Sequence, residues 1–232
     1  TAAKQNEGTF KPQAGINAKY GVTSNLTADV TYNPDFSQVE ADIPQVDVNQ
    51  RYTLYYPERR PFFLEGKDFF DTPLELVYTR KIVSPQWGFK LSGKVGRTAF
   101  GFLSAMDDSP PAINLTAVLE ETEEATGPPS RAWTNIFRLR SDLYEESHLG
   151  LILSDKEMGA VGSPLTSDFN RVAGVDGSFK FLDYNRFSFQ VLGAQSRVGP
   201  EKTDFVPALA FNLNHQSRHV NFSADWTSLP PD

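Results

Sequence analysis

The chain has 232 residues, no cysteine and a formal net charge of −7 at pH 7, with an isoelectric point near 5.0 and a mean hydropathy of −0.39. The lack of cysteine excludes disulfides, thiolate metal sites and a cysteine nucleophile, and the acidic balance argues against nucleic acid as a partner. No apolar run reaches the roughly 18 residues that a membrane-spanning helix needs.

The first predicted element is a hairpin with a hydrophobic period of two. Residues 14–23 alternate between apolar and polar side chains, and residues 26–32 repeat the pattern after a short turn at Ser24-Asn25. Successive side chains of a strand point to opposite faces, so this period predicts two antiparallel β-strands, each with one apolar face. Residues 33–85 then interrupt the rhythm with a long connection rich in aromatic and charged residues.

The same rhythm returns in the rest of the chain. The predicted hairpins pair residues 86–95 with 98–106, 131–142 with 148–154, 171–181 with 186–195, and 204–214 with 219–227. Short turns are predicted at 96–97, 144–147, 183–185 and 216–218. Long loops are predicted at 107–130, 155–170 and 196–203, which are rich in turn-forming and charged residues. Short and long connections therefore alternate.

Strands of this length, joined alternately by short turns and long loops, are typical of a transmembrane β-barrel, whose strands need about 9–11 residues to cross the bilayer. We predict an all-β fold: an antiparallel up-and-down transmembrane β-barrel, partial, with about 10–12 strands in this segment. A soluble β-sandwich, whose strands also have one apolar face, is the alternative. Both ends of residues 1–232 read as positions inside loops, so we expect a segment of a longer exported protein.

Three blocks in the first third of the chain are long and distinctive: residues 15–42, YYPERRPFFLEGKDFF at 55–70 and YTRKI at 78–82. In these blocks the chain resembles a bacterial outer-membrane β-barrel family of unknown function, usually found behind a domain similar to carbohydrate-binding module family 9. The resemblance implies location in the bacterial outer membrane. It also implies a glycan partner through the family-9-like domain, which is not part of these residues.

Parity limits the number of strands within residues 33–85. If short turns are periplasmic, the strands before and after this connection run in opposite directions, so an even number of crossings separates them. Residues 46–56 and 74–82 both alternate, and if both cross, the chain holds twelve strands and residues 57–70 lie in a long periplasmic connection. If neither crosses, the region folds into the lumen as a plug and ten strands remain. We favour two crossings.

Charged residues crowd around four phenylalanines in the block at 55–70. The charged set is Glu58, Arg59, Arg60, Glu65, Lys67 and Asp68. Because bidentate Arg–carboxylate pairs can hold a loop that is later released, these residues are a candidate gating or docking motif. The alternative is a packed connection with buried aromatic rings and charges that are paired or solvated.

The start of the same connection carries a polar motif loop, and a later loop carries an acidic run. The motif loop contains Asn33, Asp35, Glu40 and Asp42. Its carboxylates are candidates for a divalent cation or an acid–base pair, but Asn-Pro-Asp also commonly opens a turn, and we expect no metal site and no cofactor. The acidic run, Glu120, Glu121, Glu123 and Glu124, is a candidate for cation bridges to lipopolysaccharide phosphates, with a solvated loop as the alternative.

Charged side chains also lie on the polar faces of the predicted strands, where they would face the barrel lumen. They are Lys19, Asp29, Lys90, Lys94, Arg138, Arg140, Asp142, Asp176, Lys180 and Asp225. Facing charges of both signs either pair and close a lumen or line a wet channel. The sequence leaves both outcomes open.

Catalytic signatures are missing from the sequence. The three histidines, His148, His215 and His219, border predicted turns, and there is no G-x-S-x-G, H-E-x-x-H or P-loop motif. We therefore expect a non-enzymatic outer-membrane barrel, surrounded by outer-membrane lipid and lipopolysaccharide, that acts as a channel or as an anchor and conduit for a periplasmic or surface protein partner. The alternatives are a carbohydrate-binding or glycan-processing envelope protein that acts through the missing family-9-like domain, and a soluble β-sandwich binding module.

Overall fold

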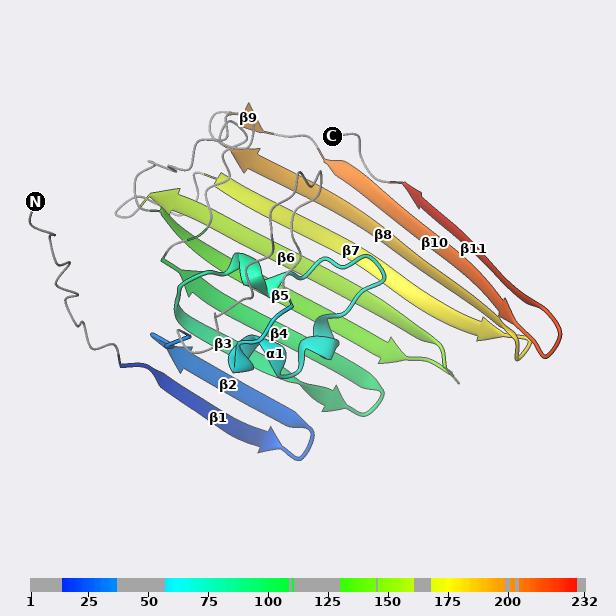
Figure 1. Ribbon diagram of the computed structural model, residues 1–232, viewed down its shortest axis with the longest axis horizontal. Helices are drawn as coiled ribbons and strands as arrows, with labels where there is room; N and C mark the ends of the chain where they lie inside the picture. The colour runs from blue at the N-terminus through cyan, green and yellow to red at the C-terminus, as the bar shows by residue number, and fades with distance from the viewer. Residues whose placement is uncertain are drawn as a thin grey trace, which may run out of the picture.

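A computed structural model describes most of the chain between residues 14 and 228. The described residues are 14–36, 57–108, 110, 130–144, 146–160, 168–198, 201–202 and 205–228. Within them, ten long strands and one two-residue strand form a single antiparallel sheet, drawn as one twisted layer in Figure 1. The predicted all-β, antiparallel fold is confirmed.

The long strands follow one another across the sheet in sequence order. They are β1 (Ile16–Thr23), β2 (Leu26–Tyr32), β3 (Pro85–Val95), β4 (Thr98–Asp107), β5 (Ser130–Asp142), β6 (His148–Ala160), β7 (Asp168–Phe181), β8 (Asn185–Val198), β10 (Val206–Gln216) and β11 (Asn221–Ser228). The short β9 (Glu201–Lys202) pairs only with β8. The described strands do not close into a barrel, and β1 and β11 form the two edges of the sheet.

Several predicted boundaries differ from those of the structure. Strand β1 begins at Ile16 instead of residue 14, β7 begins at Asp168 instead of residue 171, and β8 ends at Val198 instead of residue 195, so part of the loops predicted at 155–170 and 196–203 is strand. Strand β6 continues to Ala160, beyond the predicted end at 154, because pairing continues where Asp155 and Glu157 interrupt the apolar alternation. The last hairpin, β10 to β11, lies about two residues later than predicted.

The two crossings that we favoured between β2 and β3 are wrong for residues 74–82. Strand β2 pairs directly with β3, with Asp29 opposite Lys90, so no strand lies between them. Residues 74–82 contain no strand and end in the 3-10 helix η2 (Thr79–Lys81). The predicted strand at 46–56 lies outside the described residues, and the ten long strands match the ten-strand alternative.

The connection between β2 and β3 lies over one face of the sheet instead. We call residues 57–84 the covering segment. It contains the short helix α1 (Pro61–Leu64), the 3-10 helix η1 (Lys67–Phe70) and η2, and in Figure 1 it crosses the middle strands. Proline at the first position of α1 fits its start, because the first amide of a helix has no intrahelical partner.

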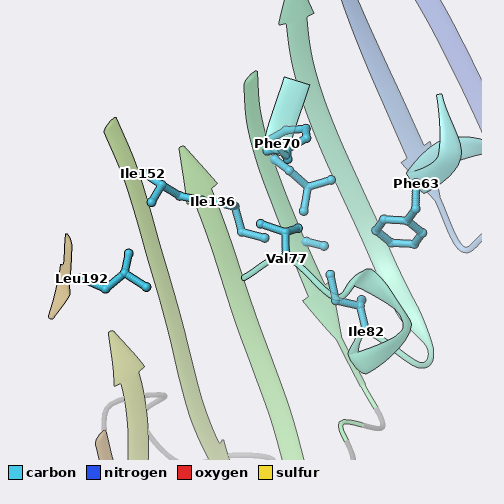
Figure 2. Packing of buried hydrophobic residues seen from close by; sticks show 9 residues of the cluster. Phe63, Phe70, Val77, Ile82, Ile136, Ile152 and Leu192 are labelled. Atoms are coloured by element: carbon cyan, nitrogen blue, oxygen red, sulfur yellow. The ribbon is translucent and has the colours of Figure 1, made fainter. Parts of the chain in front are cut away.

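The core lies between the covering segment and the sheet (Figure 2). The segment contributes Phe63, Phe70, Val77 and Ile82, and the sheet contributes Leu103, Ala105, Ile136, Ile152 and Leu192. We call the sheet face that carries these residues the inner face and the opposite face the outer face. The described residues place no second layer on the outer face, where Leu149, Val175 and Phe222 are 45%, 43% and 49% exposed.

No helix within the described residues is long and apolar enough to cross a membrane.

Candidate functional site

A dense group of hydrogen bonds lies within the covering segment, where Arg60 is 1% exposed. Its guanidinium donates to both carboxylate oxygens of Glu58, at 2.9 and 2.8 Å. It also donates to the carbonyl oxygens of Ile82 and Thr79, at 2.5 and 2.9 Å, and lies over the ring of Phe63 at 4.3 Å. Arg60 therefore ties the start of the covering segment to its end.

Glu58 is held by the same group of contacts. Its carboxylate also accepts hydrogen bonds from the Arg60 amide at 2.9 Å and from the Thr79 hydroxyl at 2.6 Å. Burial raises the pKa of Glu58, but the hydrogen bonds and the charge of Arg60 outweigh that effect, and the pKa lies below its ordinary value. The carboxylate is thus stabilised in its charged form by donors that all belong to the covering segment.

Lys90 on β3 fixes the covering segment to the sheet. Its ammonium group is buried, donates to the carbonyl oxygens of Phe62 and Glu65 at 2.6 and 2.7 Å, and forms an ion pair with Asp29 at 3.5 Å. The adjacent Lys19 pairs with the side chain of Glu65 at 2.5 Å, a contact that lowers the pKa of that carboxyl. A buried lysine with these acceptors has a structural role, because its three donors are all used.

Two inner-face glycines make room for aromatic rings of the segment. A Cβ atom at Gly88 would lie 2.8 Å from the ring of Phe62, and one at Gly101 would lie 2.9 Å from the ring of Phe70. Both separations are below any normal contact between carbon atoms. Glycine at these strand positions therefore permits the close approach of the covering segment.

The far parts of the segment are held by two polar side chains that the sequence analysis did not single out. Asp107 at the end of β4 accepts from the amides of Val83 and Ser84, at 2.7 and 2.8 Å. Gln190 on β8 accepts from the amide of Leu74 at 2.5 Å. Neither residue stands out in the sequence, because an aspartate at a strand end and a glutamine in an alternating strand are ordinary there.

A second buried ion pair lies on the inner face next to this region. Arg138 on β5 and Asp176 on β7 form a bidentate pair at 2.6 and 2.8 Å, and both are almost fully buried. They belong to strands that are not neighbours, and Gly150 on the intervening strand β6 leaves the space for their contact. His148 approaches Asp176 at 4.0 Å.

A third ionic group lies at the turn end of the inner face. Glu146 accepts from Lys180 at 2.8 Å and pairs with Arg186, which also donates to the Glu146 carbonyl oxygen at 3.3 Å. The hydrogen bond from Lys180 lowers the pKa of the Glu146 carboxyl. A pocket of about 170 Å³ opens beside this group.

The strand charges that we predicted on the lumen side all lie on the inner face by strand register. Lys94 pairs with Asp142 at 2.5 Å, and Arg140 is exposed two positions away from Arg138 on the same strand. Asp225 accepts a hydrogen bond from Asn212 at 2.5 Å. The charges on the middle strands are therefore mostly paired with each other.

The motif residues around the phenylalanines divide into two groups. Glu58 and Arg60 are buried, whereas Arg59, Glu65 and Asp68 are exposed. Lys67 pairs with Glu75 at 3.7 Å. Buried charges that are paired and other charges that are exposed are the arrangement expected for a packed connection, the alternative to a gating or docking motif.

The motif loop is described only at its start. The side-chain amide of Asn33 donates to the Ala14 carbonyl oxygen at 2.8 Å. The backbone amide of Asn33 donates to the Gln86 carbonyl oxygen at 2.7 Å. Asp35 is exposed, and Glu40, Asp42 and the acidic run at 120–124 lie outside the described residues. Within the part of the chain that the structure describes, no group of three or more His, Asp or Glu side chains has a metal-binding arrangement.

Comparison with known proteins yields one family. No curated protein and no solved structure matches the chain. The family, described as a domain of unknown function (DUF5916), matches residues 1–94, which include the three distinctive blocks but less than half of the chain. Its description names neither a membrane location nor a carbohydrate-binding association. The first two hairpin strands, the covering segment and most of β3 are thus similar to a family whose function is not known.

Proposed function

We propose that this chain forms part of the wall of a bacterial outer-membrane β-barrel, a non-enzymatic protein that acts as a channel or as an anchor and conduit for a periplasmic or surface partner. The observation that carries the proposal is the outer face. It is apolar across ten adjacent strands, and nothing in the described residues covers it.

The outer face has the composition of a lipid contact. Phe187 and Phe189 on β8 and Phe211 on the neighbouring strand β10 have stacked rings, and Trp226 on β11 continues the row at 5.4 Å from Phe211. Soluble monomers seldom expose apolar patches larger than a few hundred Å². A lipid environment removes this exposure from water, which supports a membrane location.

The apolar region of the outer face ends where charged residues begin. On β6, Leu149, Leu151 and Leu153 are followed at the next outward positions by Asp155 and Glu157. Arg171 on β7 pairs with both carboxylates, at 2.9 and 2.8 Å. Strands of 13 or 14 residues are longer than the about 9–11 needed for a crossing, and the surplus would extend above the membrane at the loop end.

The inner face supports the plug form of the barrel. The covering segment would occupy part of the lumen, held by Lys90, Asp107 and Gln190. A soluble sandwich needs a second sheet packed face to face on the first, and the described residues contain only one sheet. The barrel is therefore the better account of the two.

Detergent dependence and topology test the proposal together. We expect the protein to aggregate without detergent and to be monodisperse with it, because open edges and the outer face are both costly in water. Epitope tags near residue 120 or residue 164 should be reached on intact cells, and a tag in the turn at 183–185 should not. A water-soluble monomer with cooperative unfolding, or surface labelling at 183–185, would contradict the proposal.

A further inference from the structure

The pocket at the turn end of the inner face has a chemical character of its own. Its volume is about 170 Å³, smaller than the about 300–1,000 Å³ of pockets that enclose drug-sized ligands. The lining residues are Glu146, Lys180, Asp183, Tyr184, Asn185, Arg186, Asn214 and Gln216. They come from the turns β5–β6 and β7–β8 and from strands β7, β8 and β10.

The charged groups of this pocket balance each other. Lys180 and Arg186 are both bonded to Glu146, and Asp183 supplies a second carboxylate. Two cations and two carboxylates give no net charge, and the cationic donors are already directed at Glu146. The pocket is therefore poorly suited to an anion or a cation, since either would have to break an existing pair.

Three of the four remaining lining side chains have unused hydrogen-bonding capacity, whereas the Asn185 side chain is bonded to the Phe181 carbonyl oxygen and to His215. The side-chain amides of Asn214 and Gln216 and the hydroxyl of Tyr184 have no partner within the described residues. Each amide offers two donors and one acceptor oxygen, and the phenol offers one of each. Asn212, one inner-face position away from Asn214, is by contrast already bonded to Asp225 at 2.5 Å.

The turn that presents Tyr184 has an unusual backbone. Leu182 and Asp183 both have positive φ angles, of 51° and 58°. Left-handed backbone is uncommon for residues other than glycine and is costly for a leucine. The backbone carbonyl oxygen of Tyr184 accepts a hydrogen bond from the backbone amide of Gln216 at 2.8 Å, and this bond fixes the turn beside β10.

We propose that this pocket binds a neutral, hydroxyl-rich solute of the saccharide class. Amide groups that donate and accept at once match the hydroxyl groups of such a ligand, and the exposed Tyr184 ring gives an apolar surface for a sugar ring. A neighbouring pocket of about 380 Å³ shares Asn214 and Gln216 with the first. The shared residues favour a short chain of sugar units over a single one.

The site goes beyond the proposed membrane function and does not depend on it. Its binding is measurable in detergent micelles without any transport assay. If no probe binds while detergent dependence holds, only the site is refuted. If the protein proves water-soluble but binds the probes, the site stands and the barrel does not.

Titration calorimetry of the full-length protein in detergent tests the site with three neutral probes: maltotetraose, cellotetraose and N-acetylchitotetraose. The readout is the difference between the parent and the site variants, so that glycan binding by any other domain cancels. Binding of at least one is expected, and no heat with any of them would overturn the proposal. The double variant Asn214→Ala/Gln216→Ala should weaken binding by ten-fold or more, a loss of about 1.4 kcal/mol, because it removes two side chains that both donate and accept hydrogen bonds. The matched variant Asn212→Ala, on the same strand and face, should bind like the parent.

Two further variants separate a binding role from a folding role. Tyr184→Phe removes only the hydroxyl and should weaken binding without changing the unfolding midpoint. Glu146→Gln releases Lys180 and Arg186 and should make the pocket bind an anionic probe, trigalacturonate, which the parent does not. Unchanged affinity in Tyr184→Phe and the double variant, or no gain of anion binding in Glu146→Gln, would count against the site.

Discussion

The two halves of the inner face differ although the same alternating pattern runs through both. Under the covering segment the inner face contains Leu103, Ile136 and Ile152, together with charges that are buried and paired. On β10 and β11 it carries Asn212, Asn214, Ser223 and similar uncharged polar residues, which are at least partly exposed. The alternating strand pattern is the same in both halves, but the covering segment lies over only one of them, so inner side chains are buried there and at least partly exposed on β10 and β11.

The comparison explains why a buried charge such as Lys90 lies in the covered half. A buried lysine or arginine needs acceptors, and the covering segment supplies carbonyl oxygens to Lys90 from Phe62 and Glu65. The uncovered half has no such backbone nearby among the described residues, and Asp225 there is bonded to Asn212 and Ser223. The burial of the Lys90 charge therefore depends on the acceptors that the covering segment supplies.

Arg60→Ala should produce the largest effect on the covered half. The change leaves Glu58 buried without its cation and removes donors to Thr79 and Ile82, and breaking such a buried pair costs about 3–5 kcal/mol. Denaturant unfolding in detergent measures the loss of stability, and protease cleavage within residues 57–84 measures the release of the covering segment. The adjacent Arg59→Ala, at an exposed position, should change stability by less than about 0.5 kcal/mol. Equal effects of the two would show that the covering segment is not held by Arg60.

Arginine substitutions at adjacent positions of the strands compare the outer face with the inner face outside the covered half. Phe189→Arg places a charge on the outer face and should cost about 2–4 kcal/mol if that position lies near the membrane midplane. Leu151, Phe211 and Phe222 are equivalent outward positions. Ser188→Arg and Ser223→Arg point to the inner face and should be better tolerated. Equal damage at both sets, measured as the yield of folded protein in membranes, would contradict the assigned faces.

Gly101→Ala should have a smaller effect that is specific to the covered half. Its new methyl group would meet the ring of Phe70, and overpacking of this kind costs about 1–3 kcal/mol. The double variant Gly101→Ala/Phe70→Leu should recover part of the loss. Gly21→Ala on edge strand β1, where the nearest atom would be 3.8 Å away, is the matched control and should be neutral. Unfolding midpoints compare the three variants.

Lowering the pH should destabilise the covering segment. We expect this change in stability to be the smallest of the four. The pKa of Glu58 is lower in the folded protein than its ordinary value of 4.5. Its contribution to stability is therefore complete above pH 4.5 and is lost as the pH falls below that value through the folded pKa. Protease cleavage within 57–84 should accelerate in this range for the parent and lose that pH dependence in Glu58→Gln. Identical acid profiles would contradict a role for the Glu58 carboxylate.

The strand pattern could be predicted from the sequence because it depends on local alternation. The hairpin 86–95 with 98–106 matches β3 and β4 within a residue at each end. The same rule failed at 74–82, because alternation of Leu74, Leu76 and Tyr78 does not show whether a chain finds a partner strand. There the backbone is bonded elsewhere, with the amide of Leu74 donating to Gln190.

The contacts of the candidate site could not be predicted from local sequence patterns, because they join residues that are far apart in the chain. Arg138 and Asp176 lie on strands separated by β6, and their pairing depends on the missing side chain of Gly150. Arg60 meets Thr79 and Ile82 across about twenty residues of irregular backbone. The inner-face glycines at 88, 101 and 150 were the available signal, since strand glycines often mark a close approach.

The position of the covering segment also sets the order in which the protein can assemble. Residues 57–84 precede β4, β5, β6 and β8 in the chain, which are the strands that complete their apolar core, although Glu65 also pairs with Lys19 on the earlier strand β1. Phe70 therefore lacks its native cover until β4 and β5 are present. Pairing of β2 with β3 must also close a connection of some fifty residues, whereas most other neighbours are joined by short turns. Non-local closure of this kind is slow compared with hairpin formation, so the β2–β3 junction should be the last contact of the first four strands to form and the point at which misassembly begins.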